Sequence, residues 1–141
     1  MINLNVEDCI FCQIINRKIP ARIIHENEVL LAILDIFPIS EGHTIVIPKE
    51  HYATLKDVPN NILGIIFNNV KEICELIYNR LEIDGYNILQ NNFEAAGQVI
   101  KHFHVHIIPR IRNDRKLTIN VPKKQATDEE LDILLEQLRA N

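Results

Sequence analysis

Short runs of apolar residues divide much of the chain into predicted β-strands. The runs are roughly five to eight residues long and are either unbroken or alternate with polar residues, as strands do. One run, over residues 29–34, is almost continuously apolar, which is typical of a central strand buried on both faces. The predicted strands cover residues 22–26, 29–36, 43–48, 86–92 and 102–108.

A different spacing of apolar residues predicts the helices. Apolar side chains recur every three or four positions from residue 60 to residue 82, which predicts one long amphipathic helix. A capping box at Thr127 opens a final helix over residues 128–140, and a short helix is expected over residues 9–16. The order strand-strand-strand-helix-strand-strand predicts an α+β domain. It has an antiparallel β-meander sheet, one long helix, and short N- and C-terminal helices.

The last predicted strand carries histidine at every second position. His102, His104 and His106 alternate with large apolar residues, and a strand directs successive side chains to opposite faces, so the three imidazoles share one face. Pro109 is expected to end this strand. Half of the chain's six histidines fall in this run, which favours a dedicated imidazole site over a structural polar face. Imidazole binds metals and also acts as nucleophile, acid or base, so the spacing leaves both chemistries open.

Three further features add candidate chemistry. Gly97 and Gln98 precede the histidine strand, and a glycine with adjacent amides favours close approach to an anion such as phosphate. Asp35 follows a buried strand, where a carboxylate can bind ribose hydroxyls or simply stabilise a turn. Cys9 and Cys12 lie one helical turn apart, as in two buried thiols, a redox pair or half of a zinc site.

Composition narrows the class of protein. The chain has 141 residues, which suits one domain, and its net charge of −4 argues against nucleic-acid binding. Three cysteines, an odd and small number, argue against a disulfide scaffold, and no apolar run reaches the ~20 residues of a membrane span. The first eight residues lack the features of a leader, so a cytoplasmic protein without membrane contact is expected. Basic residues between 110 and 124 fit a solvated face better than a surface that attracts anionic substrates.

Residues 102–108 resemble the histidine triad (HIT) pattern of His-apolar-His-apolar-His-apolar-apolar at every position. The Cys9–Cys12 stretch, Ile19-Pro20, residues 34–36 and residues 42–51 extend the resemblance to the small bacterial, nucleotide-binding branch of that family. The resemblance covers roughly residues 9–112. It implies a single HIT domain over residues 1–141, with a C-terminal extension over residues 113–141, that forms a homodimer whose two sheets join across the interface.

The resemblance also implies an activity and the residues that perform it. Family members are nucleotidyl hydrolases and transferases, which implies a phosphoramidase that forms a covalent nucleotidyl-histidine on His104. His106 would bind the α-phosphate oxygen and help to protonate the leaving group, and His43 would lie nearby. Gln98 and backbone amides near Gly97 would stabilise developing charge. The residues implied to bind a purine nucleotide (an AMP or GMP derivative) are Asp35, Ile36, Asn91, Gly97, Gln98, Val99, His104 and His106.

Three more features follow from the same resemblance. Cys9, Cys12, His51 and His102 would hold a structural zinc ion, and no catalytic cofactor is required. The base pocket would be walled by Phe11, Ile14, Ile19, Ile33 and Ile36. Asn91 is typical of the phosphoramidase branch, whereas Val99 stands where family members often carry serine.

Three rival functions share parts of this pattern. A dinucleoside-polyphosphate hydrolase would use the same histidines with a different leaving group. A metal-dependent hydrolase would place zinc on the triad itself. A non-catalytic nucleotide-binding scaffold would use the cleft without chemistry.

Overall fold

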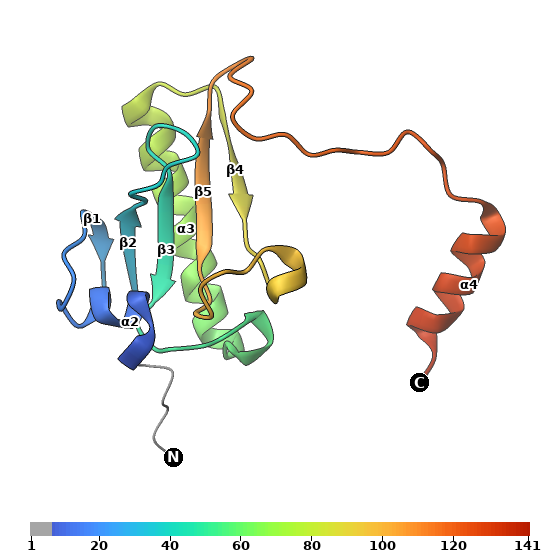
Figure 1. Cartoon of the computed structure of the whole chain (residues 1–141), viewed down its shortest axis with the longest axis horizontal. Helices are drawn as coiled ribbons and strands as arrows, with labels where there is room; N and C mark the ends of the chain where they lie inside the picture. The colour runs from blue at the N-terminus through green and yellow to red at the C-terminus, as the bar shows by residue number, and fades with distance from the viewer. Residues whose placement is uncertain (1–6) are drawn as a thin grey trace.

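A computed structural model describes residues 7–141 of the chain. The expectation about a leader concerns mainly residues 1–6, which lie outside the described residues. The described residues contain one antiparallel sheet of five strands in the order β1-β2-β3-β5-β4 (Figure 1). The strands are β1 (Ile23–Glu26), β2 (Leu30–Leu34), β3 (Thr44–Pro48), β4 (Gly85–Leu89) and β5 (Val105–Arg110). The helices are α2 (Ile10–Ile15), α3 (Asn60–Leu81) and α4 (Asp128–Arg139), with 3₁₀ turns η1 (Leu55–Asp57) and η2 (Glu94–Ala96).

The predicted α+β class and antiparallel sheet are confirmed, but the strand order departs from a simple meander. The strand β5 lies between β3 and β4 and pairs antiparallel with both. This makes β3 and β4 parallel, and parallel strands need a long crossover connection. The 22-residue helix α3 provides it, because at about 1.5 Å per residue it runs back along the whole length of the sheet.

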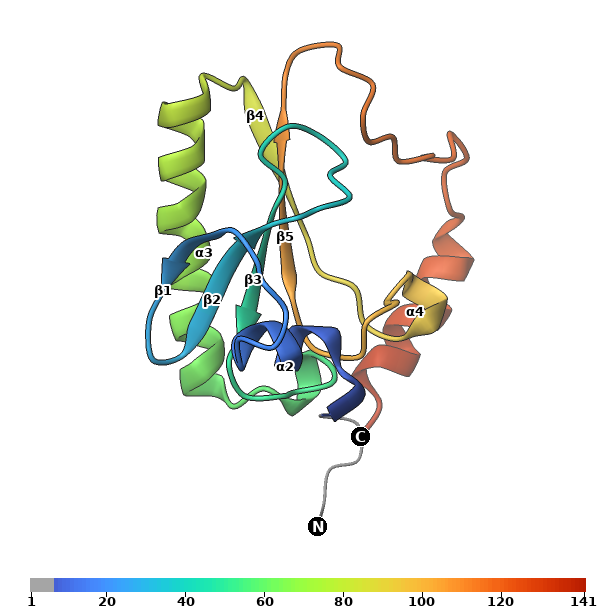
Figure 2. The same cartoon turned by 60° about the vertical axis from the view of Figure 1, so that its left-hand side comes forward.

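Both faces of the sheet are covered, which explains the nearly unbroken apolar run of β2 (Figure 2). On one face, Phe103, Val105 and Ile107 pack with the inner side of α3 in the larger core cluster. On the other face, Phe11 and Ile14 of α2 pack against alternate residues of β2 and β3. The histidines of the triad therefore belong to the α2 face, because they alternate with residues of the α3 face.

Several predicted boundaries shift for identifiable reasons. Pro109 does not end β5, which continues to Arg110 and pairs Pro109 with Tyr86. At Pro109, β5 extends past the end of β3, and there the Pro109 carbonyl accepts a hydrogen bond from the Ser40 hydroxyl. None of the described strands lies beside it on that side, so the missing N–H of proline costs the sheet no hydrogen bond. Cys9 caps α2, since its sulfur accepts from the Cys12 amide.

Within residues 7–141, no helix combines the length and apolarity required to cross a bilayer.

We predict that Phe103→Ala lowers the free energy of unfolding by about 3–5 kcal/mol, because the fully buried ring fills the core between β5 and α3. Denaturant unfolding monitored by circular dichroism measures the change. Phe37→Ala is the matched control, since Phe37 is 83% exposed and its truncation changes stability by no more than about 0.5 kcal/mol. Equal effects of the two substitutions would contradict this assignment of the core.

Candidate active site and metal site

A mostly apolar cleft of about 470 Å³ opens on the α2 face of the sheet. The five residues that the resemblance placed around a base pocket all line it. His104, His106 and Asp35 line the same cleft, together with Gly97 and Val99, so one concave surface combines apolar walls with a few polar groups. Ile36 and Phe37 form part of its rim and are largely exposed.

The hydrogen bonds of His104 determine which of its ring nitrogens is available. Its Nδ1 lies 2.6 Å from the carbonyl oxygen of His102, and a carbonyl can only accept, so Nδ1 carries the hydrogen. In the neutral ring the lone pair is then on Nε2. Burial lowers the pKa of His104, partly opposed by the His102 carbonyl and by Asp35, so the neutral ring is favoured. The ring packs edge-on against Phe11 at 5.0 Å between centroids, which limits its rotation.

A second chain of hydrogen bonds determines the tautomers of His43 and His106. The Ile39 amide donates to Nδ1 of His43 at 3.0 Å, so the hydrogen of His43 is on Nε2. This Nε2 lies 2.9 Å from Nδ1 of His106 and donates to it. His106 therefore carries its own hydrogen on Nε2. Burial, with smaller contributions from His104 and His43, lowers the pKa of His106 to about 4.

Asp35 serves the turn and the cleft together. One carboxylate oxygen accepts a hydrogen bond from the Phe37 amide at 2.8 Å, which is the turn role considered from the sequence. The other lies 3.6 Å from Nε2 of His43. Its negative charge opposes the effect of burial, which dominates and lowers the pKa of His43. Because Asp35 also lines the cleft, a ribose hydroxyl has an acceptor there.

The loop before the triad corrects one sequence-based expectation. Gly97 has φ +91°, a conformation that other residues rarely adopt, and its backbone lines the cleft. The Gln98 side chain is buried, and Gln98 is not among the residues that line the cleft. Its amide donates to the carbonyls of Ala53 and Ile100 and accepts from the Phe93 amide. Gln98 therefore holds the loop and has no free donor for a phosphate. Asn91 lies next to Gly97, with its amide nitrogen 3.7 Å from where a Cβ on Gly97 would lie.

The two cysteines and two of the histidines converge beside the cleft. The ligand atoms of Cys9, Cys12, His51 and His102 all lie within 4.8 Å of one another. Nε2 of His102 donates to the Pro48 carbonyl at 2.9 Å, so the lone pair on its Nδ1 faces the two sulfurs at 3.4 and 3.5 Å. Nδ1 of His51 lies 3.3 Å from the sulfur of Cys12. These four residues match the donor set of a tetrahedral metal site.

A second convergent group, formed by Asp35, His43 and His106, has ligand atoms equally close together but different hydrogen bonds. If Nε2 of His43 bound a metal, the ring's hydrogen would move to Nδ1 and oppose the Ile39 amide, which already donates there. Each nitrogen of this ring is therefore occupied within the protein. The group suits a fixed hydrogen-bond chain better than a metal ion, which weakens the rival with zinc on the triad.

Sequence reasoning missed the backbone groups that orient the rings. The carbonyls of Pro48 and His102 and the amide of Ile39 each bond one histidine. No residue type signals these contacts, because any residue supplies the same backbone group. Phe37 at the rim was also missed, although its place in the loop after Asp35 was a usable signal.

Comparisons with known proteins identify the family to which the chain belongs. The family model described as "HIT domain" matches residues 16–113, so the chain belongs to the HIT family. An uncharacterised HIT-like protein from Methanocaldococcus jannaschii is 41% identical over 131 residues, which cover 93% of this chain and 98% of that protein. Adenosine 5'-monophosphoramidase HNT1 of Candida albicans is 37% identical, with 93% and 89% covered. A crystal structure described as a zinc-bound histidine triad family protein from Mycobacterium smegmatis has a TM-score of 0.76 at 35% identity, covering 94% of this chain and 96% of that one.

The lowered pKa of His106 predicts a dependence of stability on pH. A histidine with a folded pKa of about 4 and an unfolded value of about 6.5 contributes fully above pH 6.5, and this contribution is lost as the pH falls toward 4. Between pH 7 and pH 5, we expect the free energy of unfolding to fall by about 1 kcal/mol less in His106→Asn than in the wild type. The asparagine side-chain oxygen can still accept the hydrogen bond from His43. Urea unfolding at both pH values measures the difference. Parallel losses in the two proteins would contradict the prediction.

Proposed function

We propose that this protein is a nucleotidyl hydrolase that cleaves nucleoside 5'-phosphoramidates, or related adenylylated substrates, through a nucleotidyl-histidine on His104. The observation that carries the proposal is the free lone pair on Nε2 of His104, in a ring whose other nitrogen is held by the His102 carbonyl inside an apolar cleft. The similarity to a relative named adenosine 5'-monophosphoramidase supports the substrate class.

In the first step, Nε2 of His104 attacks the α-phosphorus, a P–N bond to the ring forms, and the bond to the leaving group breaks. The ring becomes positively charged, and the His102 carbonyl stabilises it by accepting from Nδ1. His106 directs its Nε2–H at the α-phosphate oxygen and the leaving group, and the departing nitrogen takes this hydrogen as its bond to phosphorus breaks. In the second step, water attacks the phosphorus and returns one hydrogen to Nε2 of His106. The bond between phosphorus and Nε2 of His104 breaks, the His104 ring is released as neutral imidazole, and the nucleoside monophosphate leaves.

The cleft accounts for recognition of the nucleotide. Asp35 accepts from the ribose hydroxyls, and the apolar walls, including Phe11 and Ile33, cover the faces of a purine. Few polar groups line the cleft, so discrimination between adenine and guanine is modest. The backbone of Gly97, rather than the side chain of Gln98, approaches the phosphate.

We predict that His104→Ala reduces kcat/KM for an adenosine 5'-phosphoramidate by roughly a thousand-fold or more and abolishes the covalent adduct. Rapid quenching with a phosphorus-labelled substrate measures both quantities. His25→Ala is the matched control, because His25 lies on the edge strand β1, bonded to Asn69 and outside the cleft. Normal turnover by His104→Ala would disprove the proposal, and so would normal turnover by the wild type with no covalent adduct on His104.

The same assay separates the phosphoramidase from the dinucleoside-polyphosphate hydrolase. The proposal requires faster cleavage of the adenosine phosphoramidate than of a diadenosine polyphosphate under identical conditions. The reverse order would assign the protein to the polyphosphate branch while leaving the role of His104 intact.

We also propose that Cys9, Cys12, His51 and His102 bind a structural zinc ion. The donor set and the lone pair of His102 that faces both sulfurs support this, as does the zinc-bound relative. Burial, followed by the neighbouring Cys9 thiol, raises the pKa of Cys12 to about 12, so a thiolate here needs a cation beside it. The ion would join α2 to the segment that precedes β5 and would take no part in the chemical steps.

For this zinc site, Cys12→Ser is expected to lower the zinc content from about one ion per chain to nearly none and to lower the Tm by roughly 10 °C. Elemental analysis and thermal unfolding measure the two effects. A chelator should lower the Tm of the wild type to that of the variant and leave the variant unchanged. Cys74→Ser, which alters a buried thiol in α3, is the control and should retain zinc. Stoichiometric zinc in Cys12→Ser would contradict the assignment.

A further inference from the structure

One carboxylate oxygen of Asp35 lies between the cleft and the hydrogen-bond chain formed by His43 and His106. The other oxygen, Oδ1, is already engaged, because the Phe37 amide donates to it at 2.8 Å. Oδ2 lies 3.6 Å from Nε2 of His43, which is too long for a hydrogen bond. Since Asp35 also lines the cleft, Oδ2 can accept a hydrogen bond either from a ribose hydroxyl or from His43.

The N–H of His43 has two acceptors close to it. It donates to Nδ1 of His106 at 2.9 Å, and Oδ2 of Asp35, at 3.6 Å, is only about 0.7 Å further away. An ionised carboxylate is a stronger acceptor than a neutral imidazole nitrogen. A small rotation of the Asp35 side chain would therefore bring Oδ2 into range, and the two acceptors would then share the N–H.

The tautomer of His106 depends on this donor. While His43 donates to Nδ1 of His106, the hydrogen of His106 is confined to Nε2, where the proposed mechanism uses it. A neutral imidazole whose Nδ1 has lost its donor can carry its hydrogen on either nitrogen. The alternative tautomer would direct a lone pair, instead of an N–H, at the phosphate oxygen and the leaving group.

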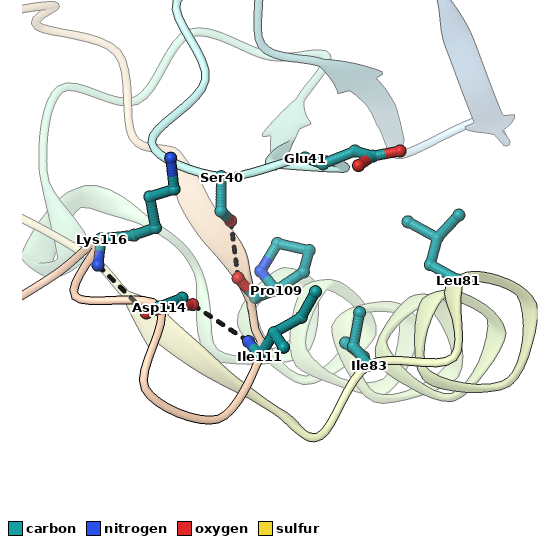
Figure 3. A pocket seen from close by; sticks show the side chains of 8 residues that line it. All are labelled: Ser40, Glu41, Leu81, Ile83, Pro109, Ile111, Asp114 and Lys116. Carbon is teal, nitrogen blue, oxygen red and sulfur yellow. Dashed lines mark hydrogen bonds between the residues drawn. The ribbon is translucent and has the colours of Figure 1, made fainter.

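The backbone that carries Asp35 and His43 is held in place. Both residues belong to the loop between β2 and β3, residues 35–43, and the Asp35 amide donates to the His43 carbonyl at 2.9 Å. Ser40 joins this loop to β5, because its carbonyl accepts from the His43 amide and its hydroxyl donates to the Pro109 carbonyl at 2.6 Å (Figure 3). The terminal torsion of an aspartate side chain is broad, so the Asp35 carboxylate is the group that can adjust.

The charge of Asp35 reaches both rings of the chain. Among the described residues that line the cleft, Asp35 is the only aspartate, glutamate, lysine or arginine. Burial lowers the pKa of His43 and of His106, and the Asp35 carboxylate opposes that effect at each ring. A hydrogen bond from a ribose to Asp35 is therefore felt at the rings that act on the phosphate.

We propose that Asp35 is a positioning residue that couples recognition of the ribose to the chemical step. Ribose hydroxyls occupy Oδ2, so the N–H of His43 stays on His106, and the N–H of His106 stays directed at the phosphate and the leaving group. A nucleotide without these hydroxyls leaves Oδ2 free to compete for His43. The inference rests on the proposed function of His104 and His106, and it makes the protein selective for ribonucleotides in rate as well as in affinity.

The rate of adduct formation with two different sugars tests this coupling. The substrates are adenosine 5'-phosphoramidate and its 2',3'-dideoxy analogue, and rapid quenching at saturating concentrations gives the maximum rate of adduct formation on His104. In the wild type, loss of the two hydroxyls should lower this maximum rate about ten-fold, in addition to weakening binding. Equal maximum rates for the two substrates, with a difference only in affinity, would overturn the proposal.

The Asp35→Asn variant separates the coupling from binding. The Phe37 amide keeps the asparagine oxygen in the place of Oδ1, so the side-chain NH₂, which cannot accept a hydrogen bond, faces His43. Both substrates should then react at the maximum rate of the wild type with the ribose substrate. Asp84→Asn is the matched control and should keep the ten-fold difference, because Asp84 lies outside the cleft and bonds the Arg112 amide. A ten-fold difference that persists in Asp35→Asn, or equal rates at the lower level, would overturn the proposal.

Nitrogen NMR of the His106 ring gives a readout that requires no turnover. AMP or 2',3'-dideoxy-AMP is added to saturation to ¹⁵N-labelled protein, and the ring resonances of His106 are compared. AMP should move Nε2 of His106 further toward the shift of a hydrogen-bearing nitrogen than the dideoxy nucleotide does, and Asp35→Asn should abolish the difference. Equal shifts would overturn the coupling even in a protein that cleaves phosphoramidates, whereas a difference would support it even if no cleavage were found.

Discussion

Hydrogen bonds from backbone groups to the histidine rings are the constraint on which the site depends. The Pro48 carbonyl, the His102 carbonyl and the Ile39 amide each bond one ring nitrogen, and each leaves the opposite nitrogen with a defined role. His102 directs a lone pair at two thiols, His104 directs one at the cleft, and His106 keeps an N–H. Three chemically identical side chains thus become a metal ligand, a nucleophile and a hydrogen-bond donor in the proposed mechanism.

This constraint depends in turn on the sheet. His106 lies within β5, while His102 and His104 lie just before it. Phe103 and Val105, which alternate with these histidines, are packed against the α3 layer. A shift of one residue would place the histidines in the core and the apolar residues in the cleft. The large apolar cluster therefore determines the register of the site. The proposed zinc would secure the same segment from the other face, because His102 provides both a ligand nitrogen and the carbonyl that orients His104.

Much of this arrangement follows from side-chain patterns. Alternation at residues 102–108 predicts that the histidines share a face, and helical spacing predicts α3, because both signals come from which residues are buried. The position of β5 between β3 and β4 was not predictable in this way, since it depends on long-range pairing. The Gln98 amide donates to the carbonyls of Ala53 and Ile100, and the histidine rings are likewise bonded to backbone groups. Such contacts were not predictable, because every residue type carries the same backbone groups. The final helix was predicted from its capping box at Thr127 and its spaced leucines, but the sequence pattern does not show where such a helix lies relative to the sheet.

The most direct test of the central claim is nitrogen NMR of the histidine rings in ¹⁵N-labelled protein at neutral pH, with each ring assigned by single substitution. Two-bond couplings between the carbon-bound ring protons and the two ring nitrogens show which nitrogen carries the hydrogen, and so distinguish the two tautomers of neutral imidazole. The account predicts a hydrogen on Nδ1 of His104 and on Nε2 of both His43 and His106. A His104 ring that carries its hydrogen on Nε2, or that is doubly protonated, would contradict it, because no lone pair would then face the cleft.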